Sequence, residues 1–239
     1  MKKLLLSFLV ITIACSSLLA QKTYNDLNVE KRTVSGFHGI AVGTGIELII
    51  VEGNLEELAV SAATPEFRDK IITKVENGIL RIYYESKTKS INKVKENKYL
   101  KAYVSYKTLD KLDATTGSDV KINGVLKATS MEMKANTGAL INGTVDINTL
   151  KVIQHTGSKI TLSGKAGKLI AEGSTGSKFK GDEMSTADCE LTVSTGALVT
   201  VNAEKELIVK ANTGGSVKYK GNAIKKEIKR STGGSVTKI

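Results

Sequence analysis

Tryptophan is absent from this 239-residue sequence, proline occurs once, and aromatic residues make up only 5%. The shortage of aromatic rings argues against a surface that recognises sugars mainly by stacking. There are two cysteines, so if Cys15 is removed with the N-terminal segment, Cys189 has no intramolecular disulfide partner. Stability must then come from packing, for which a hydrophobic content of 41% is sufficient.

Long apolar runs are also missing beyond the first twenty residues, which have the pattern of an export signal. Lys2 and Lys3 form a basic start, and an apolar run from Leu4 to Ala14 leads into mostly small residues. The run is shorter than the roughly twenty residues that span a bilayer. We therefore expect residues 1–20 to be cleaved after Ala20 and the protein to be exported, to a periplasmic, outer-membrane-associated or extracellular location.

An alternative is lipid attachment at Cys15, which follows Thr12-Ile13-Ala14 and loosely resembles a lipoprotein acceptor site. Membrane association is expected only in that case. Cleavage after Ala20 would remove two of the 35 basic residues and none of the 24 acidic ones. The mature protein would then keep 33 basic and 24 acidic residues and carry a net charge of +9.

The second half of the chain is a tandem repeat marked by the dipeptide Thr-Gly. Its spacings are 21, 19, 19, 20, 18 and 19 residues, and the positions three after and five before each glycine are apolar in every copy. The repeated threonines are Thr116, Thr137, Thr156, Thr175, Thr195, Thr213 and Thr232. Because three columns keep the same register, the repeat is structural.

Around these columns the hydrophobic pattern has mostly period two, as in Leu207-Ile208-Val209, which predicts strands with one buried face. A further glycine recurs about once in each unit and is expected to supply the positive φ of a second corner. These glycines are Gly124, Gly143, Gly164, Gly181 and Gly221. A unit of this size cannot bury its apolar face alone, so we predict an all-β fold with a parallel β-solenoid of about seven turns at residues 111–239.

Stacking would place equivalent threonines about 4.8 Å apart, so their hydroxyls are expected to hydrogen-bond along a structural ladder. The residue before each threonine can also hydrogen-bond locally, and His155 occupies one of these positions, which favours a structural role for it. Cys189 alternates with Leu191 and Val193, as expected for a small buried residue.

Residues 21–110 lack the Thr-Gly period and are expected to form a separate strand-rich N-terminal domain. Asn77-Gly78 between Ile71–Val75 and Ile79–Tyr84 predicts a β-hairpin. The single proline, Pro65, predicts a short helical turn. His38 has no acidic or histidine neighbour at ligand spacing, so a structural role is expected.

The most basic stretch, residues 87–111, contains eight lysines against Glu96 and Asp110. One interpretation is a solvated loop and strand face; the other is contact with an anionic surface polymer or lipid head groups. The residues considered for such contact are Lys87, Lys89, Lys93, Lys95, Lys98 and Lys101. The stretch has no arginine and no nucleic-acid-binding signature, so nucleic acid is not an expected partner.

The chain resembles the family of putative auto-transporter adhesins with a head GIN domain, common among secreted proteins of Bacteroidetes-type bacteria. The resemblance lies in the Thr-Gly corners and in three segments of the N-terminal half. These segments are Arg32–Ile40, Gly43–Leu48 and Val75–Leu80. It implies a mainly β, solenoid-like architecture and an adhesin-like role, and it brings no catalytic residues.

Three function classes remain. A non-catalytic surface-binding protein, contacting a surface polymer or another protein, is favoured over a structural envelope module. The third class, an enzyme acting on polysaccharides, would need clustered carboxylates. Adjacent Asp182 and Glu183 would point to opposite faces if their strand continues. No metal or cofactor motif is present, and the uncovered end of a stack makes homo-oligomerisation a further hypothesis.

Overall fold

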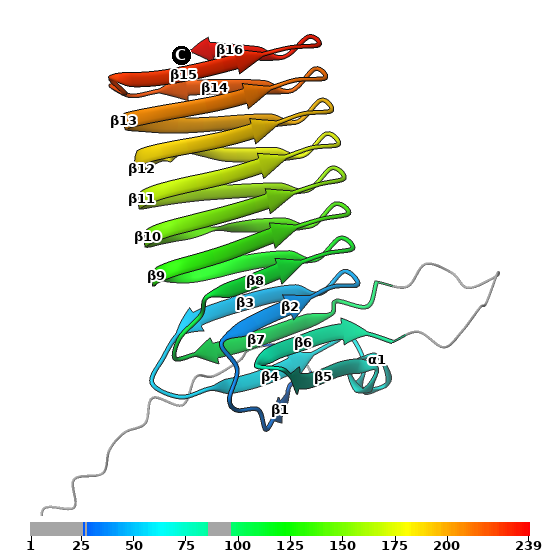
Figure 1. Cartoon of the computed structure of the whole chain (residues 1–239). Helices are drawn as coiled ribbons and strands as arrows, with labels where there is room; N and C mark the ends of the chain where they lie inside the picture. Colours follow the sequence, from blue (N-terminus) through cyan, green and yellow to red (C-terminus); the bar gives the residue numbers. More distant parts are fainter. Residues whose placement is uncertain (1–25, 27, 86–96) are drawn as a thin grey trace, which may run out of the picture.

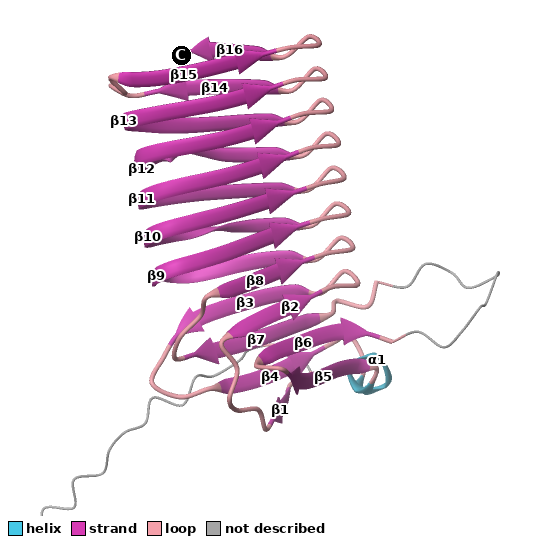
Figure 2. Ribbon diagram, in the orientation of Figure 1, coloured by secondary structure: helices cyan, strands magenta, loops and turns pink. Residues whose placement is uncertain are grey.

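The computed structural model describes residue 26 and residues 28–85 and 97–239. Its strands form one continuous sixteen-stranded sheet that coils into a solenoid (Figure 1), with a single short helix (Figure 2). The expected all-β solenoid is therefore confirmed. No helix in the described part of the chain is both long and apolar enough to cross a membrane.

Each full turn is one long strand that bends midway, followed by an exposed Thr-Gly turn. Neighbouring strands pair in parallel and nearly in the register of the repeat, as shown by Ile141 opposite Ile160. The five long strands are β9 (Asp119–Ala135), β10 (Leu140–Gln154), β11 (Lys159–Gly173), β12 (Lys178–Val193) and β13 (Leu198–Ala211). The second corner is thus a bend within a strand, and pairing resumes beyond it, without a register shift between β10 and β11 and with one at the other three interfaces of these strands.

The stack begins before the Thr-Gly repeat. Strands β2 (Gly39–Val42) and β3 (Glu47–Glu52) flank a turn at Thr44-Gly45 and pair in parallel with β8 (Lys111–Ala114) and β9. This additional turn comes first along the chain. An insertion separates it from the next Thr-Gly turn, so it does not fit the repeat spacing. The domain boundary expected near residue 110 lies within this continuous sheet.

The insertion builds the N-terminal end of the rod (Figure 1). It contains the expected hairpin and a helical turn that opens at Pro65, where Thr64 caps the helix by accepting from the Phe67 amide. Its elements are β4 (Glu57–Ser61), α1 (Pro65–Asp69), β5 (Ile71–Glu76), β6 (Ile79–Tyr84) and β7 (Lys101–Tyr106). Strand β1 (Glu30–Arg32) pairs antiparallel with β4 and is the edge strand of the sheet at this end.

The apolar columns of the repeat line one core that runs from Phe37 to Ala223. Val120, Val199 and Val217 are each no more than 1% exposed, as the stacking hypothesis requires. Removing such side chains from water contributes roughly 1.5–3 kcal/mol each, which stabilises the rod without disulfides.

The expectation that every second-corner glycine has positive φ is only partly right. Gly124, Gly164 and Gly221 do have positive φ, whereas Gly143 and Gly181 do not. The latter two are glycines because neighbouring side chains occupy their Cβ space. A Cβ on Gly143 would lie 2.4 Å from the Ile122 Cβ, and one on Gly181 would lie 2.6 Å from a ring carbon of Phe179.

Candidate functional site

The exposed edge of the solenoid is a row of eight stacked Thr-Gly turns. Both central residues have positive φ, 46–61° for the threonines and 68–75° for the glycines, as in a type I′ turn. The turns are joined by seven backbone bonds, in which the glycine N–H of every turn but the last donates to the threonine carbonyl of the next turn, for example Gly138 to Thr156 at 3.0 Å. The ladder on this edge therefore runs through the main chain.

The threonine side chains of this edge are exposed in all eight turns. Within the described residues, no hydrogen bond joins the hydroxyls of equivalent threonines, although stacking favoured such bonds. Three of these hydroxyls bond only the residue before them, as Thr213 does with Asn212 at 3.2 Å. The threonine hydroxyls thus belong to exposed residues, and within the described residues they make no bond from one turn to the next.

Threonine is an unusual choice here, because a β-branched residue with positive φ is strained and Asn or Gly would take the same conformation at little cost. The strain is repeated in eight turns, while the glycine beside each threonine already permits the turn. The threonine carbonyls join the turns, but their exposed side chains form no bond between turns, and strained residues with such side chains point towards function.

The column before the threonines makes one side-chain bond between turns. His155 Nδ1 lies 2.6 Å from Ser174 Oγ, which occupies the equivalent position one turn later. This hydrogen bond gives His155 a structural partner, in agreement with the role expected from its place in the repeat.

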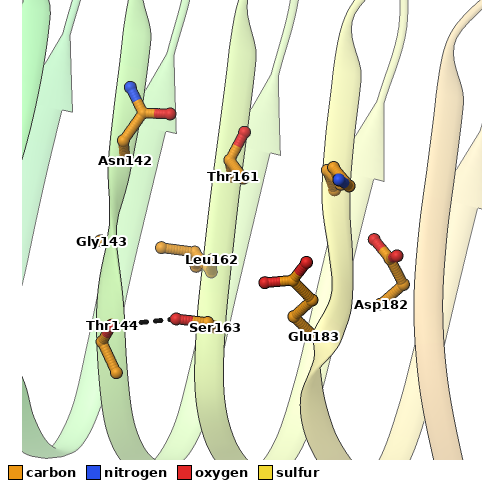
Figure 3. A pocket seen from close by; sticks show the side chains of 9 residues that line it. Asn142, Gly143, Thr144, Thr161, Leu162, Ser163, Asp182 and Glu183 are labelled. Atoms are coloured by element: carbon orange, nitrogen blue, oxygen red, sulfur yellow. Dashed lines mark hydrogen bonds between the residues drawn. The ribbon is translucent and has the colours of Figure 1, made fainter.

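A depression of about 250 Å³ lies over β10, β11 and β12 (Figure 3). The Glu183 carboxylate extends towards β11, where Ser163 Oγ lies 2.9 Å from Thr144 Oγ1 (Figure 3). Oδ1 of Asp182 and Oγ1 of Thr161 are buried and have no hydrogen-bond partner among the described residues. The polar groups of the depression that a hydroxylated ligand can reach are therefore the Glu183 carboxylate and the Thr144–Ser163 hydroxyl pair.

Asp182 and Glu183 line the same depression because their strand does not continue regularly. The register of β12 shifts between Gly181 and Ser185, which is a β-bulge that re-aims the side chains between them. The separation of the two carboxylates is expected only for a strand that continues regularly, and the register shift of β12 removes that condition. No group of three or more His, Cys, Asp or Glu side chains suited to a metal ion occurs in the part of the chain that the structure describes.

The lysine stretch is only partly within the described residues, since Lys87, Lys89, Lys93 and Lys95 lie outside them. Lys98 lies 5.7 Å from the ring centres of both Phe67 and Tyr84, a cation–π arrangement. Lys101 Nζ lies 3.1 Å from an Asp26 carboxylate oxygen. Both described lysines thus have partners within the N-terminal end of the rod.

A second hollow, of about 450 Å³, is lined by His38 and Asp110 among others. His38 Nδ1 lies 2.7 Å from Asp110 Oδ1, and its amide donates to the Gly78 carbonyl at 2.9 Å. The imidazole also occupies the space of a Cβ at Gly78. His38 therefore fastens the hairpin turn to the segment before β8, a structural contact that no sequence pattern pointed to.

Cys189 is buried as expected, and desolvation by burial raises the pKa of its thiol to about 12. Since the thiolate is the reactive form, we expect iodoacetamide at pH 8 to leave Cys189 of the folded protein unmodified. Unfolding in urea should restore the reactivity of an ordinary thiol. Peptide mapping by mass spectrometry measures both, and rapid labelling of Cys189 in the native protein would contradict this burial.

The fold places the protein among parallel β-solenoids that carry a strand-rich N-terminal cap. Residues 36–223 match the family model described as putative auto-transporter adhesin, head GIN domain. The chain belongs to this family, as the resemblance of its motifs predicted. The family description suggests an exported or cell-surface protein and includes no catalytic activity.

Solved structures share the fold at low sequence identity. A putative adhesin from Bacteroides fragilis is 18% identical with a TM-score of 0.74, covering 88% of this chain and 96% of that chain. A putative adhesin from Parabacteroides merdae is 13% identical with a TM-score of 0.71, covering 90% and 97%. A putative lipid binding protein from Parabacteroides distasonis is 16% identical with a TM-score of 0.67, covering 90% and 97%. Comparison with curated proteins gives no match.

Proposed function

We propose that this protein is a non-catalytic, exported, adhesin-like protein that binds a surface polymer or another protein through its row of Thr-Gly turns. The observation that carries the proposal is the presence of eight exposed threonines, each in a strained conformation and none bonded to its equivalent in the next turn. A ligand with a regular repeat could contact successive turns at once. Such contacts add avidity from individually weak hydrogen bonds.

Replacing Thr137, Thr156 and Thr175 by Asn should change stability and binding in opposite directions, so the two effects can be distinguished. Asn accepts positive φ, so the triple variant should be more stable by about 1–3 kcal/mol. The same change removes three hydroxyls and three methyl groups from the centre of the row, so binding should fall at least tenfold. Urea unfolding measures stability, and the labelled full chain on glycan and matrix-protein arrays measures binding.

The matched control makes the same chemical change on the strand faces, at Thr149, Thr192 and Thr200, and should leave binding within twofold. Equal loss in both variants would mean that the turn row is not the contact surface. A chain that binds nothing on either array, at low or high salt, would favour a structural envelope module instead.

The depression at the β12 bulge favours a polysaccharide-active enzyme as the second candidate. Asp182 and Glu183 both line it, and glycosidic cleavage commonly uses a pair of carboxyl groups. If the enzyme interpretation is correct, Asp182→Asn or Glu183→Gln should lower release of reducing sugar from an oligosaccharide panel by at least a hundredfold. Under the proposed function, the unmodified chain releases no sugar and neither substitution changes binding on the arrays.

A further inference from the structure

Within the described residues, both ends of the rod have strands that pair on one side only, β1 and β5 at the N-terminal end and the last two strands at the other, but the two ends differ in the side chains around these edges. At the N-terminal end, β1 pairs with β4, and the Arg32 guanidinium donates to the Ile71 carbonyl of β5. At the other end, β15 (Lys225–Arg230) pairs only with β13, and β16 (Ser235–Lys238) only with β14 (Ser216–Lys220), within the described residues. These last strands therefore present unpaired backbone N–H and C=O groups.

The buried apolar columns of the core do not all continue into β15. Its register pairs with β13 are Leu207 with Lys226, Val209 with Ile228, and Ala211 with Arg230. The three β13 residues are buried, whereas Ile228 is 37% exposed and both cations are exposed. The last strand thus presents one partly uncovered apolar residue between two cations, at positions that face the core one turn earlier.

This end also holds much of the positive charge of the protein. Residues 216–239 contain seven basic residues against Glu227, a net charge of +6 within a chain total of +11. Lys225 pairs with Glu206 at 2.5 Å and Lys229 with Glu227 at 2.9 Å. The remaining cations of the last rung, Lys226, Arg230 and Lys238, form no ion pair with any described residue.

The charges, the apolar residue and the unpaired backbone groups together favour one kind of ligand at this edge over others. A second copy approaching through the same end would set cations opposite cations, which is destabilising in paired strands. An anionic polysaccharide would satisfy the charges but could not pair with the backbone groups of β15. An extended acidic peptide satisfies both, and an apolar side chain between its carboxylates would cover Ile228.

We infer that the C-terminal edge is a docking site for an extended acidic peptide segment, which adds to β15 as one more strand. Alternate residues of the segment follow the order acidic, apolar, acidic, opposite Lys226, Ile228 and Arg230. Opposite charges in directly paired positions contribute favourably to strand association. The inference does not rest on the proposed function, because the turn row and this edge are separate surfaces.

The test uses two labelled peptides, Thr-Glu-Thr-Val-Thr-Glu-Thr and Thr-Lys-Thr-Val-Thr-Lys-Thr, with capped ends. Fluorescence anisotropy with the full chain should show the glutamate peptide binding at least tenfold more tightly than the lysine peptide. Raised salt should weaken this binding, since the charges are exposed. The double variant Lys226→Glu, Arg230→Glu should reverse the preference between the two peptides.

The matched control, Lys159→Glu with Lys178→Glu, makes the same charge change on exposed positions of β11 and β12. It should leave the affinity for the glutamate peptide within twofold. Equal loss in both double variants would overturn the inference, because it would mean binding by overall charge alone. So would a failure of the native chain to bind the glutamate peptide, or sedimentation showing that a second copy occupies this end.

Discussion

Gly164→Ala should lower the free energy of unfolding by about 3–5 kcal/mol, through backbone strain and overpacking together. Gly164 has φ +101°, and a Cβ there would lie 2.2 Å from the carbonyl oxygen of Val145 in the strand it pairs with. A backbone oxygen held in a ladder cannot move aside as a side chain end can. The midpoint of urea unfolding, followed by circular dichroism, measures the change.

Gly124→Ala is the matched control, because Gly124 also has positive φ, +90°, but has open space where a Cβ would stand. This variant should lose only the strain, about 1–2 kcal/mol. The difference between the two variants isolates the close approach of one turn to the next. Equal losses would show that the turns at Gly164 are not stacked as closely as described.

Much of this architecture follows from repetition in the sequence. Three columns in constant register are enough to predict stacked turns, because only a stack lets every unit bury the same face. The first turn, at Thr44-Gly45, is not predicted from the sequence because the insertion of residues 57–106 breaks the repeat spacing. Strand pairing over so long a separation depends on tertiary packing, for which the local sequence carries no periodic signal.

The bulge that brings Asp182 and Glu183 to one depression did leave a trace in the sequence. The unit from Thr175 is 20 residues long and the next is 18. Three β12 residues between Gly181 and Ser185 have no partner in β13, and one extra β13 residue after Ala203 reduces the net difference to two. The 21-residue unit that starts at Thr116 likewise contains a register shift of β9, between Lys121 and Val125. Departures from the modal repeat length therefore predict where strands bulge, and period-two reasoning fails there.

The charge of the C-terminal end was overlooked for a different reason. The stretch at 87–111 stands out by lysine count, yet its described members Lys98 and Lys101 have partners in the fold. Whether a cation is available depends on contacts with residues distant in sequence. The sequence signal for Lys226 and Arg230 is a charged residue in the last repeat at a position that is apolar and buried one turn earlier.

Phe179→Ala is expected to cost about 3–5 kcal/mol, the usual range for emptying a buried phenylalanine site. Phe179 is 2% exposed and is the single aromatic residue in a column otherwise filled by valine, isoleucine and, in the first turn, Leu48. Its ring covers Gly181 two residues later on the same side of β12. The ring therefore fills the space that a side chain at Gly181 would occupy, in addition to the space at position 179.

This arrangement predicts a rescue that copies the next turn, where Val199 and Val201 occupy the equivalent positions. Phe179→Val alone should leave a cavity, and Gly181→Val alone should clash with the ring, whose nearest carbon would lie 2.6 Å from a Cβ at Gly181. The double variant exchanges one large residue for two of intermediate size, so it should recover most of the lost stability. A coupling energy of about 1–3 kcal/mol from urea unfolding of all four proteins would support this packing. Strictly additive losses would instead mean that the ring does not fill the Gly181 site, and that the bulge beside it has another cause.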